Sequence, residues 1–332
     1  MNPDRDKEKF SRRQFLNRSV KAAACAAAAC AAGYLFHDSK GPAPSEERLP
    51  DVHLPDFSIP GLNKKMAIVR GEHRSEMLNT ALKALGGPEM FIKNGDRVLL
   101  KVNAAFATPA ILSATSHPQL VSELTGLCYR AGASAVWVTD NPINDPASCF
   151  ELSGIAQAAR SAGAKVLLPE AGFFKPATVP GGNLIRSWPV LYEPLKSVDK
   201  VIGVAPVKDH RRSGASMIMK NWYGLLGGRR NIFHQDIHNI IKELAMMVKP
   251  SLVILDGTTA MVTNGPTGGS LSDLKTTNTM IVATDQVAAD ACGAGLIGKS
   301  ADDLPYIAKA EAMGVGTADY QSLNPVFVNG WS

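Results

Sequence analysis

Short apolar runs rich in β-branched residues alternate with longer amphipathic stretches through most of this 332-residue chain. The alternation favours an α/β fold, because parallel strands need helical crossovers between them. The apolar runs predict strands at 66–70, 97–102, 135–139, 165–168, 200–204, 252–255 and 280–283. The amphipathic stretches predict helices at 74–85, 118–131, 149–162, 214–225, 234–248, 286–296 and 302–313. We therefore expect a mainly parallel β-sheet covered by helices, built as one large domain or as two intertwined lobes.

Two of the predicted helices end in Ala-Gly-Ala, at residues 131–133 and 162–164, and each leads directly into a predicted strand. Glycine suits the left-handed residue just past a helix end because it has no Cβ atom. The turn residues and the hydrophobic pattern therefore predict the same helix–strand boundaries.

The N-terminus resembles a twin-arginine export signal. Arg12 and Arg13 precede a Phe-Leu pair, and an alanine-rich run extends from Ala22 to Ala32. The apolar segment that ends at Phe36 is about 15 residues long, short of the roughly 20 that a membrane-spanning helix needs. We therefore interpret residues 1–36 as a signal for the twin-arginine export machinery, either cleaved near Ala32 or retained as an anchor.

Residues 37–63 are rich in proline, serine and charged residues, which predicts an extended linker. The remaining residues, 64–332, would form the α/β domain. Export would place this domain in the periplasm or another extracytoplasmic space, either free or tethered to the membrane by the N-terminus.

Most of the formal net charge of +5 belongs to the signal. Residues 1–40 contain eight Lys and Arg against four Asp and Glu, and the rest of the chain contains 27 against 26. A nearly neutral domain argues against nucleic acid as a partner, because phosphate backbones are bound by clustered cations.

Cysteines are scarce in the predicted domain. Cys128, Cys149 and Cys292 are far apart in sequence and form no C-x-x-C pair, so the sequence predicts no iron–sulfur cluster within this chain. One disulfide and three free thiols both remain open as interpretations.

Polar residues stand where several predicted strands end: Lys101, Asn103, Asp140, Lys208, Asp256 and Asp285. In open α/β sheets, ligands bind outside the carboxyl ends of the strands. Taken together, these side chains predict a ligand-binding crevice at that edge of the sheet. Taken singly, each Asp could simply cap a loop or the helix that follows.

A segment from Lys208 to His234 is densest in groups suited to an anionic ligand. Lys208 and Lys220 supply positive charge, Asn221 supplies a directional amide, and glycines let backbone N–H groups approach a ligand. Lys220, His210 and His234 are the candidate catalytic residues, with a histidine transferring protons. The alternative is a solvated basic loop above a buried Trp-Tyr pair.

Two further residues are candidates for ligand binding. His117 opens a predicted helix next to a proline, where free backbone N–H groups attract anions. Asn264 begins a tight glycine turn after a predicted strand. The chain has no G-x-G-x-x-G after a strand, no P-loop and no G-x-S-x-G, which argues against standard dinucleotide, nucleotide and serine-hydrolase sites.

A metal site is a separate hypothesis. His234 and His238 are one helical turn apart, so both side chains can point the same way. A carboxylate such as Asp256 or Asp285 could complete the set of ligands. Histidines at this spacing are also common by chance.

Together, these residues resemble the DUF362 family of uncharacterised proteins. The motifs that carry the resemblance, in chain order, are Lys101-Val102-Asn103, Ser116-His117-Pro118, Asp140, Lys208-x-His210, Lys220-Asn221-x-x-Gly224, His234, Lys249-Pro250, Asp256-Gly257, Asn264-Gly265-Pro266-x-x-Gly269 and Asp285-x-x-x-x-Asp290-Ala291. These motifs are distributed over most of the predicted domain.

Some members of this family carry a ferredoxin-like module with cysteine-ligated clusters, which implies redox work. This chain lacks the cysteines for one, so electron transfer would need a separate redox partner. The export signal, the polar residues and the resemblance together predict an exported protein that binds a small anionic ligand or a metal in a crevice at the strand C-termini, and the redox modules of some relatives suggest a redox-associated enzyme. The alternative is a non-catalytic binding or assembly factor for a periplasmic redox partner.

Overall fold

A computed structural model describes residues 11–35, 50–62 and 64–329. The chain divides into two compact units, Met1–Leu49 and Pro50–Ser332. In the first unit, helix α1 spans Arg12–Leu35. Within the described ranges, no helix has both the length and the hydropathy to cross a membrane. Residues 1–10 of the predicted signal, and residue 36 with the predicted linker residues 37–49, lie outside the described residues.

The second unit is built on a central sheet. Within the described residues its strand order is β11-β1-β10-β9-β7-β2-β3-β4, with β8 paired to β7. The strands are β1 (Met66–Arg70), β2 (Arg97–Lys101), β3 (Ala135–Thr139), β4 (Lys165–Leu167), β7 (Lys200–His210), β8 (Gly214–Ser216), β9 (Leu252–Met261), β10 (Leu274–Ala283) and β11 (Val326–Asn329). The predicted α/β fold with a mainly parallel sheet is confirmed.

Strand direction decides which strand ends meet. Strands β4, β3, β2, β7 and β9 are parallel to one another, so their carboxyl ends lie at one edge of the sheet. Strand β10 runs antiparallel to both β9 and β1, so its carboxyl end lies at the opposite edge. This reversal separates residues that the sequence had placed together.

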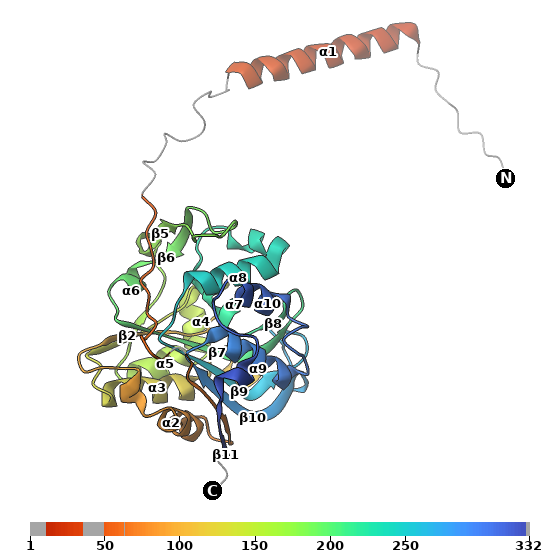
Figure 1. Ribbon diagram of the computed structural model, residues 1–332. Helices are drawn as coiled ribbons and strands as arrows, with labels where there is room; N and C mark the ends of the chain where they lie inside the picture. Colours follow the sequence, from red (N-terminus) through yellow and green to blue (C-terminus); the bar gives the residue numbers. More distant parts are fainter. Residues whose placement is uncertain (1–10, 36–49, 63, 330–332) are drawn as a thin grey trace, which may run out of the picture. The chain divides into compact units, whose positions relative to one another are not determined.

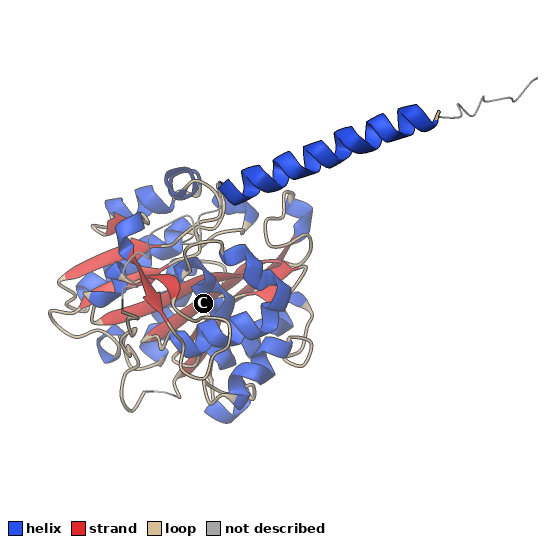
Figure 2. Ribbon diagram, turned by 90° about the horizontal axis from the view of Figure 1, so that it is seen from above, coloured by secondary structure: helices blue, strands red, loops and turns tan. Residues whose placement is uncertain are grey.

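Helices cover both faces of the sheet (Figures 1 and 2). One core contains side chains of α2 (Arg74–Ala84), α3 (Pro118–Arg130), α4 (Pro146–Leu152) and α5 (Ile155–Ser161). The other contains side chains of α6 (Glu193–Lys196), α7 (Ile218–Asn221), α8 (Ile237–Met247), α9 (Gln286–Ala294) and α10 (Pro305–Ala312). Along the central strands, side chains alternate between the cores: Val201 packs in one and Ile202 in the other.

Short 3-10 helices lie between these elements, at Pro88–Met90, Ala110–Leu112, Ala171–Phe173, Trp222–Leu225, Arg230–Asp236, Leu271–Asp273, Gly295–Ile297 and Tyr320–Leu323. A separate antiparallel pair, β5 (Phe174–Ala177) with β6 (Trp188–Leu191), was not predicted from the sequence. Both of its strands contain proline, which weakens a strand signal.

Several predicted boundaries were wrong. The helix expected at 149–162 is two helices, because Gly154 between them has φ +76° and ends the first. The helix expected at 214–225 is instead strand β8, the short helix α7 and a 3-10 turn. Strands β7 and β9 run about six residues past their predicted ends, which carries β7 as far as His210.

Residues 50–62, which the sequence placed in a linker, pack against the domain. The N–H of Val52 donates to the carbonyl of Pro176, and the N–H of Phe57 donates to the carbonyl of Lys249. The Phe57 ring is 4% exposed. This part of the chain therefore covers the domain surface instead of extending away from it.

Candidate functional site

A cavity of about 560 Å³ lies at the edge where the parallel strands end. Its walls come from the loops after β2 and β3, the end of β7, helix α7 and the segment after it. This size suits a small-molecule ligand. Seven of the predicted site residues line it: Asn103, Asp140, Lys208, His210, Lys220, Asn221 and His234.

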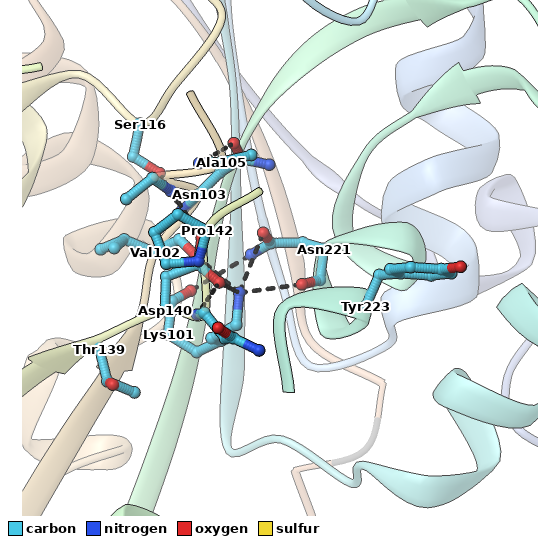
Figure 3. Close-up of polar contacts among 12 residues, drawn as sticks. Lys101, Val102, Asn103, Ala105, Ser116, Thr139, Asp140, Pro142, Asn221 and Tyr223 are labelled. Atoms are coloured by element: carbon cyan, nitrogen blue, oxygen red, sulfur yellow. Dashed lines mark hydrogen bonds and ion pairs between the residues drawn. The ribbon is translucent and has the colours of Figure 1, made fainter. Parts of the chain in front are cut away.

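The floor of the cavity is a buried ion pair. Nζ of Lys101 lies 2.7 Å from Oδ1 of Asp140, and both side chains are at most 3% exposed. The same ammonium donates to the carbonyls of Val102 and Asn221 at 2.8 and 2.9 Å. Oδ2 of Asp140 accepts the N–H of Ala104. Figure 3 shows these contacts joining Lys101, Asp140 and Asn221.

Lys101 is therefore part of the support beneath the cavity. Burial lowers the pKa of its ammonium, and the adjacent carboxylate of Asp140 opposes that shift. Because its donors already have acceptors, Lys101 is not free to neutralise a ligand. The sequence placed Lys101 among the residues of a ligand-binding crevice, and its pairing with Asp140 corrects that prediction.

Helix α7 carries Lys220 and Asn221 into the site, and a remote carboxylate anchors it. Asp290 on α9 accepts the backbone N–H groups of Ile218 and Met219 at 2.8 and 3.1 Å. Burial raises the pKa of Asp290 to about 8. The amide of Asn221 also donates to the carbonyls of Lys101 and Val204. These contacts fix where the Lys220 side chain leaves the backbone.

Among the described residues, three cations face the cavity without a carboxylate of their own. Nζ of Lys208 donates to the carbonyl of Ala114 at 2.6 Å. Nζ of Lys220 lies 5.2 Å from the centre of the Tyr223 ring and has no hydrogen bond or ion pair among the described residues. In the part of the chain that the structure describes, the Arg230 guanidinium donates to backbone carbonyls alone.

Burial and mutual repulsion act on these cations. Burial, reinforced by the charge of Lys220, lowers the pKa of Lys208 to about 7. Burial, reinforced by Arg230, lowers the pKa of Lys220 to about 8. Among the described residues that line the cavity, Asp140 is the one carboxylate, and Lys101 already neutralises it. The cavity therefore carries an excess of positive charge.

The two histidines of the cavity present different groups to a ligand. Nδ1 of His210 accepts the backbone N–H groups of Arg212 and Ser213, each at 3.2 Å, so its proton is on Nε2. Burial and the neighbouring Lys220 lower the pKa of His210 to about 2, so the ring stays neutral. His210 is therefore suited to donate a hydrogen bond rather than to accept a proton.

His234 has the opposite arrangement. The Tyr223 hydroxyl donates to the carbonyl of Arg230 at 2.5 Å, so its oxygen accepts a proton from Nδ1 of His234, 3.1 Å away. In that tautomer Nε2 of His234 is the unprotonated ring nitrogen, and a backbone hydrogen bond with Asn231 also acts on the ring. The His210 and His234 rings are stacked with their centres 6.1 Å apart. A donor and an acceptor thus lie side by side in the cavity.

The predicted metal set is wrong. Asp256 pairs with Arg74 at 2.7 Å, and Asp285 caps α9 at the opposite edge of the sheet, because β10 is antiparallel. His238 stacks on Tyr306, apart from His234. Within the described residues, no group of three or more His, Cys, Asp or Glu side chains could hold a metal ion.

Two predicted ligand-binding residues do not line the cavity either. His117 caps α3, its Nδ1 accepting the N–H of Gln119, and the charges of Arg74 and Asp256 act on its ring. Asn264 donates to the carboxylate of Asp273 at 2.6 Å, although Pro266 and Thr267 of the same turn do line the cavity. Both side chains thus serve local structure.

Arg230, Tyr223 and Phe106 line the cavity but were not selected from the sequence. Arg230 and Tyr223 lie within the segment that the sequence marked as suited to an anion. The run of two glycines and two arginines that ends at Arg230 was the sequence signal for Arg230. Phe106 follows β2 in an apolar loop, and no sequence signal distinguishes it from a core residue. The described cysteines Cys25, Cys30, Cys128, Cys149 and Cys292 are free thiols.

Gly224 tests the packing of the cavity floor. A Cβ atom at this position would overlap Oδ1 of Asp140 and lie 2.9 Å from Nζ of Lys101. Gly224→Ala should therefore disrupt the buried ion pair and lower the free energy of unfolding by about 3–5 kcal/mol. Urea unfolding followed by circular dichroism measures the change.

Gly295→Ala is the matched control, because a Cβ atom there has no neighbour within 4 Å. It should leave stability unchanged or slightly higher, since alanine favours a helical backbone. If Gly224→Ala were as stable as the unaltered protein, the tight packing of the ion pair would be contradicted.

Comparisons with known proteins place the chain in a family. It is 12% identical to the lactate racemase apoprotein from Thermoanaerobacterium thermosaccharolyticum, with a TM-score of 0.39 over 73% of this chain and 58% of that one. A protein from Thermotoga maritima gives 12% identity and a TM-score of 0.33 over 56% of this chain and 51% of that one. The chain thus spans little more than half the length of either structure.

The thylakoid-associated protein sll1697 of Synechocystis sp. is 24% identical over 246 residues, which cover 72% of this chain and 74% of that protein. The domain of unknown function DUF362 matches residues 98–295, more than half of the chain. This protein therefore belongs to the DUF362 family.

Proposed function

We propose that this protein binds a small anionic ligand, a carboxylate or a phosphate ester, in the cavity at the carboxyl edge of the sheet. One observation carries the proposal: Lys208, Lys220 and Arg230 face one cavity, and the carboxylate in its lining is already paired. Keeping unpaired cations out of water is costly. An anion would offset that cost through charge-assisted hydrogen bonds.

The neutral groups of the cavity would orient such a ligand. Nε2–H of His210 can donate to an anionic oxygen, and the unprotonated Nε2 of His234 can accept a proton from the ligand or from water. Lys220 would make the most direct contact, because its ammonium has no hydrogen-bond acceptor among the described residues.

Lys220→Met tests the proposal. The full-length variant should bind malonate or inorganic phosphate at least about tenfold more weakly, because it loses a hydrogen bond to a charged group. The binding constants would be measured by isothermal titration calorimetry, and ligand-induced stabilisation by thermal unfolding.

Lys165→Met is the matched control, since Lys165 is exposed at the start of β4 and does not line the cavity. It should bind both anions like the unaltered protein. Equal affinities for Lys220→Met and Lys165→Met would refute the assignment of the anion to this cavity.

Anion affinity should also depend on pH in a defined direction. An anion stabilises the ammonium form of Lys220, whose pKa is lowered to about 8 in the free protein. Affinity should therefore be highest near the acidic end of the range from about pH 6 to about pH 9 and decrease by up to about tenfold per pH unit above about pH 8, as the Lys220 ammonium is lost. Calorimetry between about pH 6 and pH 9 would measure this decrease.

The histidines do not predict the same profile. Burial lowers the pKa of His210 to about 2 and lowers the pKa of His234 below its usual value, so neither histidine accounts for a decrease in affinity above pH 8. An affinity that does not change across the range would show that no lysine charge is needed for binding.

We also propose that the protein is exported by the twin-arginine route. The paired Arg12 and Arg13, at the start of α1, support this proposal, and so does the name of the thylakoid-associated relative. Replacing both residues by lysine should leave the full-length precursor in the cytoplasm of a bacterial host, as fractionation and immunoblotting would show. Lys21→Arg is the control and should be exported normally. Export of the double variant would disprove this route.

A further inference from the structure

Two buried lysines lie on neighbouring strands, and their surroundings differ. Lys101 on β2 has a carboxylate 2.7 Å away and backbone acceptors. Lys208 on β7 is 1% exposed and has one hydrogen-bond acceptor, the carbonyl of Ala114. Its other close contact is the Phe106 ring, 5.3 Å from Nζ. Among the described residues, the fold therefore pairs Lys101 with a carboxylate and leaves Lys208 without an ion pair.

A lysine that served only as a fixed cation would be expected to have a partner like that of Lys101, since an unpaired buried charge is strongly unfavourable. Lys208 instead lines a cavity next to a second cation, Lys220. A desolvated lysine beside another cation holds much of its amine in the neutral form, in which the nitrogen lone pair is nucleophilic. The pKa of about 7 agrees with this arrangement.

We propose that Lys208 is a nucleophile that forms a Schiff base with a 2-oxo acid bound in this cavity. This inference rests on the proposed function, because it specifies the anion as a carboxylate next to a carbonyl group. The carboxylate would lie against the Lys220 ammonium. The carbonyl carbon would then face the amine of Lys208 in the same cavity.

The reaction balances with the groups present and solvent. The Lys208 nitrogen attacks the carbonyl carbon, and a proton moves from nitrogen to the former carbonyl oxygen to give a carbinolamine. That hydroxyl then takes a second proton and leaves as water, while the nitrogen lone pair forms the C=N bond. The net step takes up one proton from solvent and releases one water. His234 would transfer these protons, with Nε2 as the unprotonated nitrogen of the tautomer that donates from Nδ1 to Tyr223.

Lys220 is the poorer nucleophile of the two. Its pKa of about 8 leaves it mostly as ammonium at neutral pH, and it lies over the Tyr223 ring, which favours the cation. The two lysines would therefore have different roles: Lys220 stays charged to hold the carboxylate, and Lys208 supplies the amine.

The test is reductive trapping on the full-length protein. Pyruvate is added with sodium cyanoborohydride at neutral pH, and peptide mass spectrometry locates the reduced adduct. Adduct on Lys208 should exceed that on exposed Lys165 by at least about tenfold, because far more of its amine is neutral. Malonate, which has no ketone, should compete, and uncharged hydroxyacetone should be trapped less than pyruvate.

Lys208→Arg is the key variant, since its guanidinium retains a positive charge but cannot form the imine. It should lose trapping at this position, and calorimetry with malonate should still detect binding. Malonate binding without adduct on Lys208 in the unaltered protein would overturn this inference and leave the proposed function intact. Absence of both would overturn both. Adduct mainly on Lys220, or equal trapping of hydroxyacetone, would also overturn the inference.

Discussion

The ion pair between Lys101 and Asp140 is the interaction on which the rest of the site depends. It connects the ends of β2 and β3 to helix α7, since the Lys101 ammonium also binds the carbonyl of Asn221. It also neutralises Asp140, the carboxylate that the described residues contribute to the cavity lining. Because Asp140 is already paired with Lys101, it does not neutralise Lys208, Lys220 or Arg230, and the cavity keeps an excess of positive charge. The same ion pair therefore supports the cavity and determines the charge of its lining.

Strand direction explains which sequence-based predictions succeeded. Lys101 ends β2, Asp140 follows β3 and Lys208 lies near the end of β7, and the parallel register brings them to one edge. Asp285 follows β10, which is antiparallel, and so lies at the other edge. The apolar runs of parallel and antiparallel buried strands look alike in sequence, so the pattern could predict the strands but not this reversal.

The individual roles within the site were harder to predict than its location. The dense segment from Lys208 to His234 indicated an anion site, and most of its selected side chains do line the cavity. The pairing of Lys101 with Asp140 joins residues far apart in sequence, and no local pattern specifies such a pair. The hydrogen bonds that Nδ1 of His210 accepts depend likewise on the backbone turn at Arg212 and Ser213, and the sequence pattern did not predict this turn.

Helix α7 has only four residues, too few to hold its own shape in water. Its position is set from outside, by the Asp290 carboxylate at its first N–H groups and by the Asn221 side chain at its end. Asn221, which binds the floor of the cavity, and Lys220, which we propose contacts the ligand, are adjacent on this one short element. They must therefore move as a unit, and a substitution at position 290, behind the cavity, could retune ligand preference without altering any residue in its wall.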